Sequence, residues 1–297
     1  PLIEIVHLPE TFSRRSGDLS ANVSLRLHTG ARTIRFRVNH GEWRSADRWH
    51  VRTPVPLATI ELLPQELRPG VNDFEVEVGA RLRPPERSAH TFRYDPTPLE
   101  LPLEVDWKER ELEVQDGYWE TIERDGVWRV RPRPGYEGYD RILLVTGALP
   151  VDRRIETDVI FRHTTLAPAS RGAREYAFGV LSLWGGHPED ESYFPRRGWS
   201  FAMAWWWSKP GGAGNEISYK KGAGRPLWVS SYRDEPLVPD VPYRVVIEVR
   251  DVRDDAGRHL SHRQRMQWWR ADTSPPEGWL ELDDVEGAPL PEGDYGI

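Results

Sequence analysis

Short runs in which apolar and polar residues alternate recur along this chain, and they constrain its fold more than any other feature. Period-two alternation is typical of strands that bury one face, whereas an amphipathic helix needs a period near 3.6. In residues 34–39, for example, the apolar side chains at even positions would face one way and the polar ones at odd positions the other. The 26 prolines and 25 glycines interrupt such runs without forming a repeat, as in turn-rich β proteins. The sequence therefore predicts an all-β fold.

The alternating runs give the strands that we expect. In the first third of the chain they are Leu2–Leu8, Ala21–Leu27, Thr33–Val38, Leu57–Leu62, Asp73–Val78 and His90–Tyr94, with a hairpin turn at Asn39–Gly41 that leads into residues 42–49. In the remainder they are Leu112–Val114, Trp119–Glu123, Val127–Arg131, Ile142–Thr146, Arg154–His163, Tyr176–Trp184, Ser200–Trp207, Glu216–Lys220, Leu227–Ser231, Tyr243–Arg250 and Ser261–Arg270.

Strand density and proline content predict two domains. About seven strands in about 95 residues is typical of an immunoglobulin or fibronectin-III sandwich. The prolines between Asp95 and Pro102 are typical of a stiff linker. We therefore expect an immunoglobulin-like β-sandwich over residues 1–97, a linker over 98–103, and a larger domain over 104–297.

Composition excludes several classes of protein and site. The net charge of −7 argues against a nucleic-acid partner. No apolar run approaches the roughly 18 residues that a membrane span needs, so no membrane insertion is expected. The absence of cysteine excludes disulfides and thiolate metal sites. The chain begins at Pro1 and not at Met, which fits a mature form or an excerpt that has lost an export signal.

Residues 104–297 carry a family resemblance. The segments DGYWETIERDGVWRVRP, RRIETDVIFRH, YRVVIEVRDV and HRQRMQWWRADTSPPEGWLEL resemble the LamG-like, concanavalin A-like jelly rolls of secreted bacterial proteins. In that family a late strand runs into a Trp, then a Pro/Glu-rich turn and a second Trp, as Trp268 and Trp269 do before Trp279. The resemblance implies a jelly roll in an extracellular or cell-surface protein. In such domains a segment like EGDYGI leads into a final strand, so we expect a jelly roll that lacks its last strand or receives it from elsewhere.

Fourteen tryptophans point to a glycan, because an indole face stacks on the C–H face of a sugar ring. In residues 201–207, period two puts the large side chains at odd positions on one face, which we expect in the core. Ala202, Ala204 and Trp206 would form the opposite, open face and leave room for a sugar on a concave sheet. The alternative is that both faces belong to the core.

Two other strands add polar candidates. In 262–270, Met266 and Trp268 fit the core, whereas Arg, Gln and Trp side chains share the other face and suit acidic or neutral sugars. In 154–163, Ile155, Val159 and Phe161 would point inward and acidic residues outward. The alternative for both is a solvated strand face. The predicted ligand-binding residues are Trp206, Trp269, Arg263, Arg265, Gln267, Glu156, Asp158 and Arg162.

Catalysis and metal binding are less favoured. Glu156-Thr-Asp158 resembles the Glu-x-Asp-x-(x)-Glu strand of jelly-roll glucanases, but Ile160 and Phe161 stand where the third carboxylate belongs. A lyase could recruit residues from the set His163, His187, Tyr219, Arg263 and Arg265, yet the alginate-lyase motifs are not matched. We therefore assign no catalytic residue and no metal ligand. No cofactor is expected, and a structural calcium is left open at the acidic pairs Asp254–Asp255 and Asp283–Asp284.

These observations favour a non-catalytic carbohydrate-binding or adhesive protein on the outside of a bacterium, with a polysaccharide or surface glycan on the concave face of the jelly roll. The alternative is a structural subunit of a surface layer or filament, which self-associates by strand donation. A polysaccharide lyase or glycoside hydrolase is a further alternative.

Overall fold

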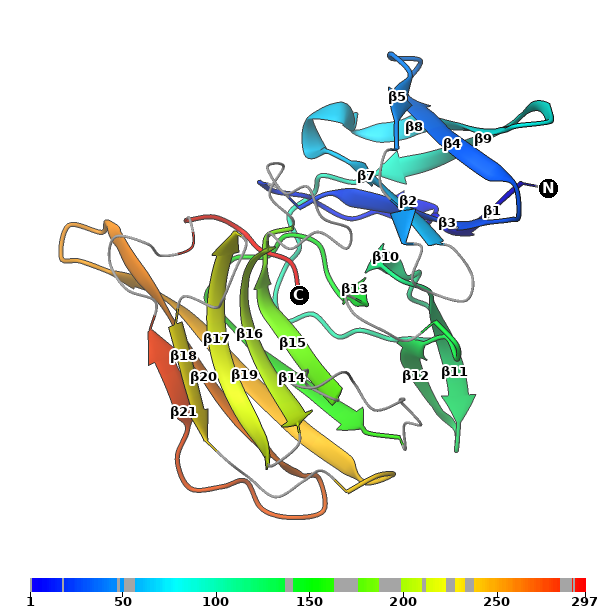
Figure 1. Ribbon diagram of the computed structural model, residues 1–297. Coiled ribbons are helices and arrows are strands. Elements are labelled where there is room, and N and C mark those ends of the chain that lie inside the picture. The colour runs from blue at the N-terminus through cyan, green and yellow to red at the C-terminus, as the bar shows by residue number, and fades with distance from the viewer. Residues whose placement is uncertain are drawn as a thin grey trace. The chain divides into compact units, whose positions relative to one another are not determined.

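The computed structural model describes residues 2–17, 19–46, 49–50, 57–136, 141–162, 176–186, 199–209, 212–222, 228–232, 238–283, 290 and 292–297. These residues form strands and one short 3-10 helix, η1 (Pro64–Glu66), with no α-helix among them (Figure 1). The strands are β1 (Ile3–His7), β2 (Thr11–Phe12), β3 (Ala21–Leu27), β4 (Ala31–Val38), β5 (Arg44–Ser45), β6 (Trp49–His50), β7 (Leu57–Leu62), β8 (Gly70–Ala80), β9 (Arg83–Tyr94), β10 (Glu113–Asp116), β11 (Trp119–Arg124), β12 (Val127–Pro132), β13 (Ile142–Leu144), β14 (Arg153–Ile160), β15 (Tyr176–Trp184), β16 (Trp199–Lys209), β17 (Gly212–Gly222), β18 (Trp228–Tyr232), β19 (Pro242–Arg253), β20 (His259–Arg270) and β21 (Leu280–Asp283).

The all-β prediction is confirmed. Strands β3, β7 and β15 coincide with their predicted runs, and the other predicted runs overlap a strand. The predicted hairpin turn is also present: Asn39 and His40 have φ of 51° and 59°, and the Gly41 N–H donates to the Val38 carbonyl over 2.9 Å. Two successive positive φ angles match the twist of the flanking strands. The segment 42–49 after this turn contains β5, which pairs with β4, and reaches the first residue of β6. The short strands β2 and β21 were not predicted, because a few residues carry too little alternation to be recognised.

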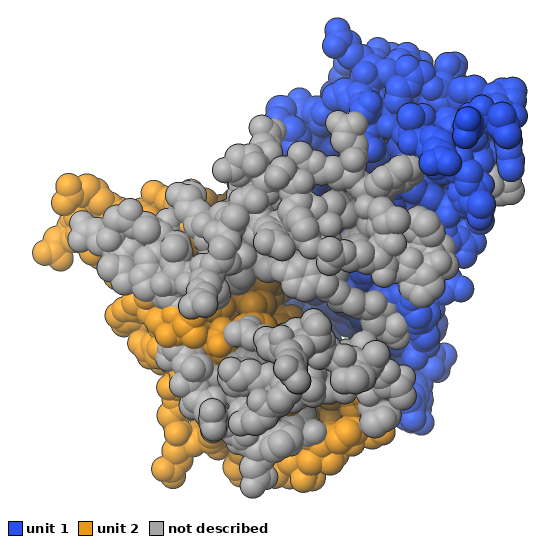
Figure 2. Space-filling model, viewed as in Figure 1, with its two compact units in different colours: residues 1–149, 191–197, 296 blue, residues 150–190, 198–295, 297 orange. Residues whose placement is uncertain are grey.

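The chain divides into two compact units, which Figure 2 colours separately. Unit 1 comprises residues 1–149, 191–197 and 296, and unit 2 comprises 150–190, 198–295 and 297. This corrects the predicted boundary at 98–103, because β10 is bonded to the first unit. The Asn22 side chain donates to the Gln115 carbonyl over 2.7 Å, and the Ser13 hydroxyl donates to Glu113 over 2.6 Å. Prolines mark a stiff stretch of chain and not the place where contacts between units become sparse.

Unit 1 has two main sheets around one apolar core. Their strand orders are β1-β3-β7-β6 and β2-β9-β8-β4-β5, and β2 pairs with β9 in parallel. Period-two alternation aims Leu25 and Ile60 from one sheet and Val76 from the other into this core. Phe12 meets Phe92 edge to face at 5.2 Å. Two-stranded ribbons, β10-β13 and β11-β12, complete the described part of this unit.

Unit 2 has two four-stranded antiparallel sheets. We call β15-β16-β17-β18 the front sheet and β14-β19-β20-β21 the back sheet, after their places in Figure 1. Between them lies a second apolar core, to which both sheets contribute: Leu183, Ala202, Ala204, Trp206, Ile217 and Tyr219 from the front sheet, and Val245, Ile247, Val249, Met266 and Trp268 from the back sheet. The predicted inward faces of β14 and β20 are confirmed, since Ile155, Val159 and Phe161 pack against this core and Met266 and Trp268 belong to it. Within the described part of the chain, no helix has the length and apolar character that a membrane crossing requires.

Candidate functional site

The outward surface of the back sheet, which we call the polar face, gathers most of the predicted site residues. Strand register sets this face: Glu156 pairs with Val246, Glu248 with Arg265, and Arg265 with Glu281. Since directly paired residues project to the same side, four strands present one continuous surface. Its members are Arg154, Glu156 and Asp158 on β14, Arg244, Glu248 and Arg250 on β19, Arg263, Arg265, Gln267 and Trp269 on β20, and Glu281 and Asp283 on β21.

Glu248 is the centre of an ion-pair network on the polar face. Arg265 donates to one of its oxygens over 2.9 and 2.6 Å, and Arg154 donates to the other over 2.7 Å. Burial alone would raise the pKa of Glu248, but the hydrogen bonds from the two guanidiniums outweigh it and lower the pKa. This carboxylate is therefore ionised near neutral pH and able to accept further hydrogen bonds.

An aromatic side chain lies beside this network. The Arg265 guanidinium carbon is 4.4 Å from the centroid of the Trp279 ring, well within cation–π range. Gln267 donates to the carbonyls of Pro276 and Gly278, each over 3.0 Å, and so fixes the turn that carries Trp279. Gln267 is thus a positioning residue, and its amide nitrogen is already engaged by the protein.

A half-open hollow of about 380 Å³ lies on the polar face, lined by Glu248, Arg250, Arg263, Arg265 and Glu281. Arg263 is held by Asp283 over 2.7 and 2.9 Å. Arg250 is directly opposite Arg263 across the strands, is exposed, and has no ion-pair partner among the described residues. An exposed guanidinium beside a second one is a ready site for a carboxylate or sulfate group.

Comparisons with protein-family models, with curated proteins and with solved structures found no match.

The placement of Trp206 corrects our prediction. Ala202, Ala204 and Trp206 do share a face, but that face is buried, and Trp206 is only 4% exposed. Its ring meets Phe161 edge to face at 5.0 Å. Alternation shows which side chains share a face but not which face is inside. The two alanines leave room here for the large side chains of the opposite sheet, so Trp206 is not a sugar platform.

The opposite face of β16 was predicted to lie in the core. In the structure it points away from the core of unit 2. Met203 and Trp205 are half-buried there, and the Trp205 indole N–H donates to Glu216 over 2.8 Å. Gly179 lies against them on β15, where a Cβ would come within 2.8 Å of the Met203 sulfur. The side chains of Phe201 and Trp207 lie outside the described residues.

The other predicted site residues are distributed as follows. Trp269 is half-buried on the polar face, and Glu156 and Asp158 are exposed there, in ion pairs with Arg154 and Arg244 respectively. Arg162 lies beyond the end of β14 and pairs with Asp240. It is therefore not joined to the network of the polar face.

Of the residues considered for catalysis, the structure brings Arg263 and Arg265 together in the hollow, where Arg263 pairs with Asp283. Tyr219 is buried, and its hydroxyl donates to the His262 carbonyl over 2.9 Å. Asp254 accepts hydrogen bonds from the backbone and side chain of Arg258, which occupy the oxygens a cation would need. Residues His163, His187 and Asp284 lie outside the described residues.

Five members of the polar face were not considered for any site: Arg154, Arg244, Glu248, Arg250 and Glu281. Trp279 beside this face and one separate cluster were missed as well. Trp279 was noted only as part of a family resemblance, and Arg250 only as the end of a strand. The cluster consists of Asp251, His259 and His262. The pair of histidines three residues apart was the one signal available, but alternation puts such residues on opposite faces of a strand.

Proposed function

We propose that this protein is an exported, non-catalytic carbohydrate-binding module, and that it holds an acidic polysaccharide on the polar face of the back sheet. The observation that carries the proposal is the exposed Arg250, which has no ion-pair partner among the described residues and lines a hollow together with Arg265, whose guanidinium lies over the Trp279 ring. This combination offers a cation for a uronate or sulfate group and an indole for the sugar ring.

Each part of the hollow suits one part of such a ligand. A carboxylate of the sugar accepts hydrogen bonds from Arg250. Sugar hydroxyls donate to Glu248 and Glu281, which are acceptors when ionised. The guanidiniums of Arg263 and Arg265 are held by carboxylates on the same face, so little side-chain freedom is lost when the ligand binds.

We further propose that unit 1 is immunoglobulin-like and unit 2 a concanavalin A-like jelly roll. The order β1-β3-β7-β6 corresponds to strands A-B-E-D of an immunoglobulin sandwich, and β9-β8-β4 corresponds to G-F-C. Two facing antiparallel sheets around one core support a jelly roll for unit 2. Neither fold specifies a ligand, so the functional proposal depends on the polar face alone.

A glycan array followed by calorimetry on the intact chain tests the proposal. We expect binding to uronate-containing polysaccharides that weakens with added salt and is lost in Arg250→Ala and Trp279→Ala. Arg258→Ala is the matched control, because Arg258 is an exposed cation in the β19–β20 turn, away from the hollow. No binding to acidic or neutral polysaccharides, or equal loss in the control, contradicts the proposal.

A further inference from the structure

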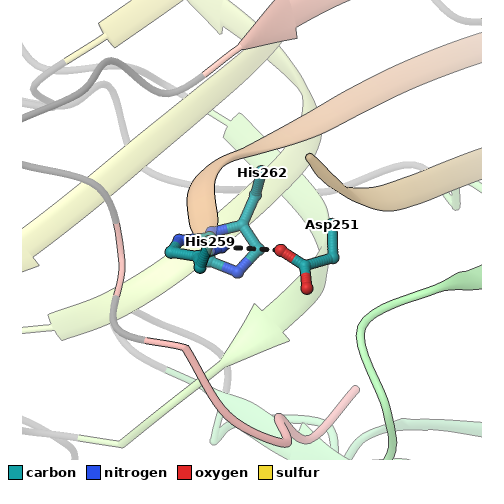
Figure 3. A group of neighbouring side chains, drawn as sticks. All are labelled: Asp251, His259 and His262. Carbon is teal, nitrogen blue, oxygen red and sulfur yellow. Dashed lines mark hydrogen bonds and ion pairs between the residues drawn. The ribbon is translucent and has the colours of Figure 1, made fainter. Parts of the chain in front are cut away.

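Three metal-ligating side chains converge at the end of the β19–β20 hairpin in unit 2. Asp251, His259 and His262 each offer one ligand atom, and these atoms lie within 4.8 Å of one another. Figure 3 shows the three side chains directed toward one another, with a hydrogen bond between His259 and Asp251. We propose that this cluster is a binding site for a divalent transition metal of the zinc type, separate from the polar face.

Strand register explains why these residues meet. Asp251 is paired directly with His262, and both continue the core-facing series of their strands. In a regular strand His259 would face away from His262. The register shifts between Val252 and Arg253, where one extra residue on β20 is left unpaired. Such a bulge turns the preceding side chain to the other face, which brings His259 beside His262.

The three side chains are largely buried, unlike an acidic cluster on an exposed surface. The His262 side chain is fully buried, and the side chains of His259 and Asp251 are only 11% and 13% exposed. The imidazole rings lie 4.5 Å apart between centroids. A buried arrangement keeps the ligands at fixed positions, and most of the ordering cost is met when the hairpin folds.

Charge and donor type select the class of metal. The Nδ1 atom of His259 is 2.6 Å from one oxygen of Asp251, and Arg253 pairs with the other oxygen and also with Glu292. With neutral imidazoles, Asp251, Glu292 and Arg253 together carry one net negative charge, which favours a divalent cation. Two imidazoles and one carboxylate suit Zn²⁺ and its neighbours, whereas Ca²⁺ and Mg²⁺ prefer six or more oxygens.

Metal binding would connect separate parts of unit 2. The three ligands come from both strands of the hairpin, on either side of its turn. The His262 ring also meets Tyr295 edge to face at 6.0 Å, and the His262 carbonyl accepts from Tyr219 of the front sheet. A metal here links the two strands of the hairpin, holds His262 in place against these neighbours and stabilises unit 2, because it binds the folded form preferentially.

Titration of the chelator-treated, intact chain with Zn²⁺, and with Co²⁺ as a visible-absorbing probe, tests the proposal. We expect one equivalent of either ion to bind, Co²⁺ with d–d bands of four-coordinate geometry, and Ca²⁺ not to compete. His262→Gln should weaken Zn²⁺ binding by more than about 100-fold, the upper end of what is lost when a residue that only orients a metal ligand is replaced.

Because His262 is buried, Asp251→Asn serves as a second variant of nearly equal shape, whose fold is checked by thermal unfolding. His90→Gln, on β9 of unit 1, is the matched control and should bind Zn²⁺ like the parent chain. Failure of the parent chain to bind either ion, stronger binding of Ca²⁺, or unchanged affinity in a folded Asp251→Asn variant would overturn the assignment.

Discussion

The guanidinium of Arg265 stacks on the Trp279 ring at 4.4 Å and donates two hydrogen bonds to Glu248. One side chain thus connects the aromatic turn after β20 to the carboxylate at the centre of the polar face. Planar, forked guanidinium geometry is needed for both contacts at once. The arrangement of the hollow therefore depends on the planar shape of the Arg265 guanidinium as well as on its charge.

Arg265→Lys keeps the charge but removes the fork and the flat stacking surface. We expect binding of an acidic polysaccharide to weaken by about tenfold, corresponding to about 1.4 kcal/mol. Stability should change by less than about 1 kcal/mol, because the ion pair is partly exposed. Calorimetry and urea unfolding on the same preparation measure both quantities. Unchanged affinity in the Lys variant would show that the stacked geometry has no part in binding.

Replacement of two tryptophans separates packing from binding. Trp206→Ala removes a buried indole from the core of unit 2 and should destabilise the unit by about 3–5 kcal/mol. Trp269→Ala, on the half-buried outward side of β20, should cost clearly less stability and reduce polysaccharide binding. Urea unfolding compares the two variants. If Trp206→Ala were as stable as the parent chain, the buried position of Trp206 would be wrong.

Asp116 gives unit 1 a distinctive pH dependence. Burial raises its pKa to about 7, against the opposing effect of Arg141 at 3.9 Å. The folded state holds this proton more tightly than the unfolded state, where the pKa is near 3.8. The contribution of Asp116 to stability is therefore complete below about pH 4 and is lost as pH rises toward 7, by roughly 4 kcal/mol at most.

Asp116→Asn should remove that slope, because the amide does not titrate. Urea unfolding of the parent chain and the variant between about pH 4 and 8 measures the difference. We expect the variant to gain stability relative to the parent as pH rises. Parallel curves for the two proteins would mean that Asp116 titrates alike in the folded and unfolded states.

His7 should change stability with pH in the opposite direction to Asp116, over nearly the same pH range. The Trp119 backbone N–H donates to its Nε2 atom over 3.0 Å, so this nitrogen must be unprotonated. Burial lowers the pKa of His7 from 6.5 to about 4. Its contribution is therefore present above about pH 6.5 and is lost as pH falls toward 4, by up to about 3 kcal/mol. His7→Gln retains an acceptor and should reduce the loss in acid, as urea unfolding would record; an equal loss in both proteins contradicts this role.

The local alternation of apolar and polar residues predicted the strands. The positions of the candidate sites depend on how the two sheets of unit 2 face each other and on a bulge in β20, which alternation does not report. Alternation correctly grouped Ala202, Ala204 and Trp206, but whether that group is buried depends on Phe161, just after β14, and on side chains of the back sheet, which are distant in sequence. The outward face of β20 was predicted correctly, because Met266 and Trp268 identify the apolar side.

Alternation could not predict the metal-ligating cluster or the boundary between the two units. The bulge that brings His259 beside His262 breaks the period that alternation assumes. The boundary at Leu149 depends on hydrogen bonds from Asn22 and Ser13 to β10, which no run of prolines reports.

Hydrogen–deuterium exchange of the intact chain, with and without a uronate oligosaccharide, tests the polar face most directly. We expect slower exchange in β20, in β21 and in the turn that carries Trp279, with little change in β3 or β16. Protection centred on the front sheet or on unit 1, or no protection at saturating oligosaccharide, would contradict the proposal.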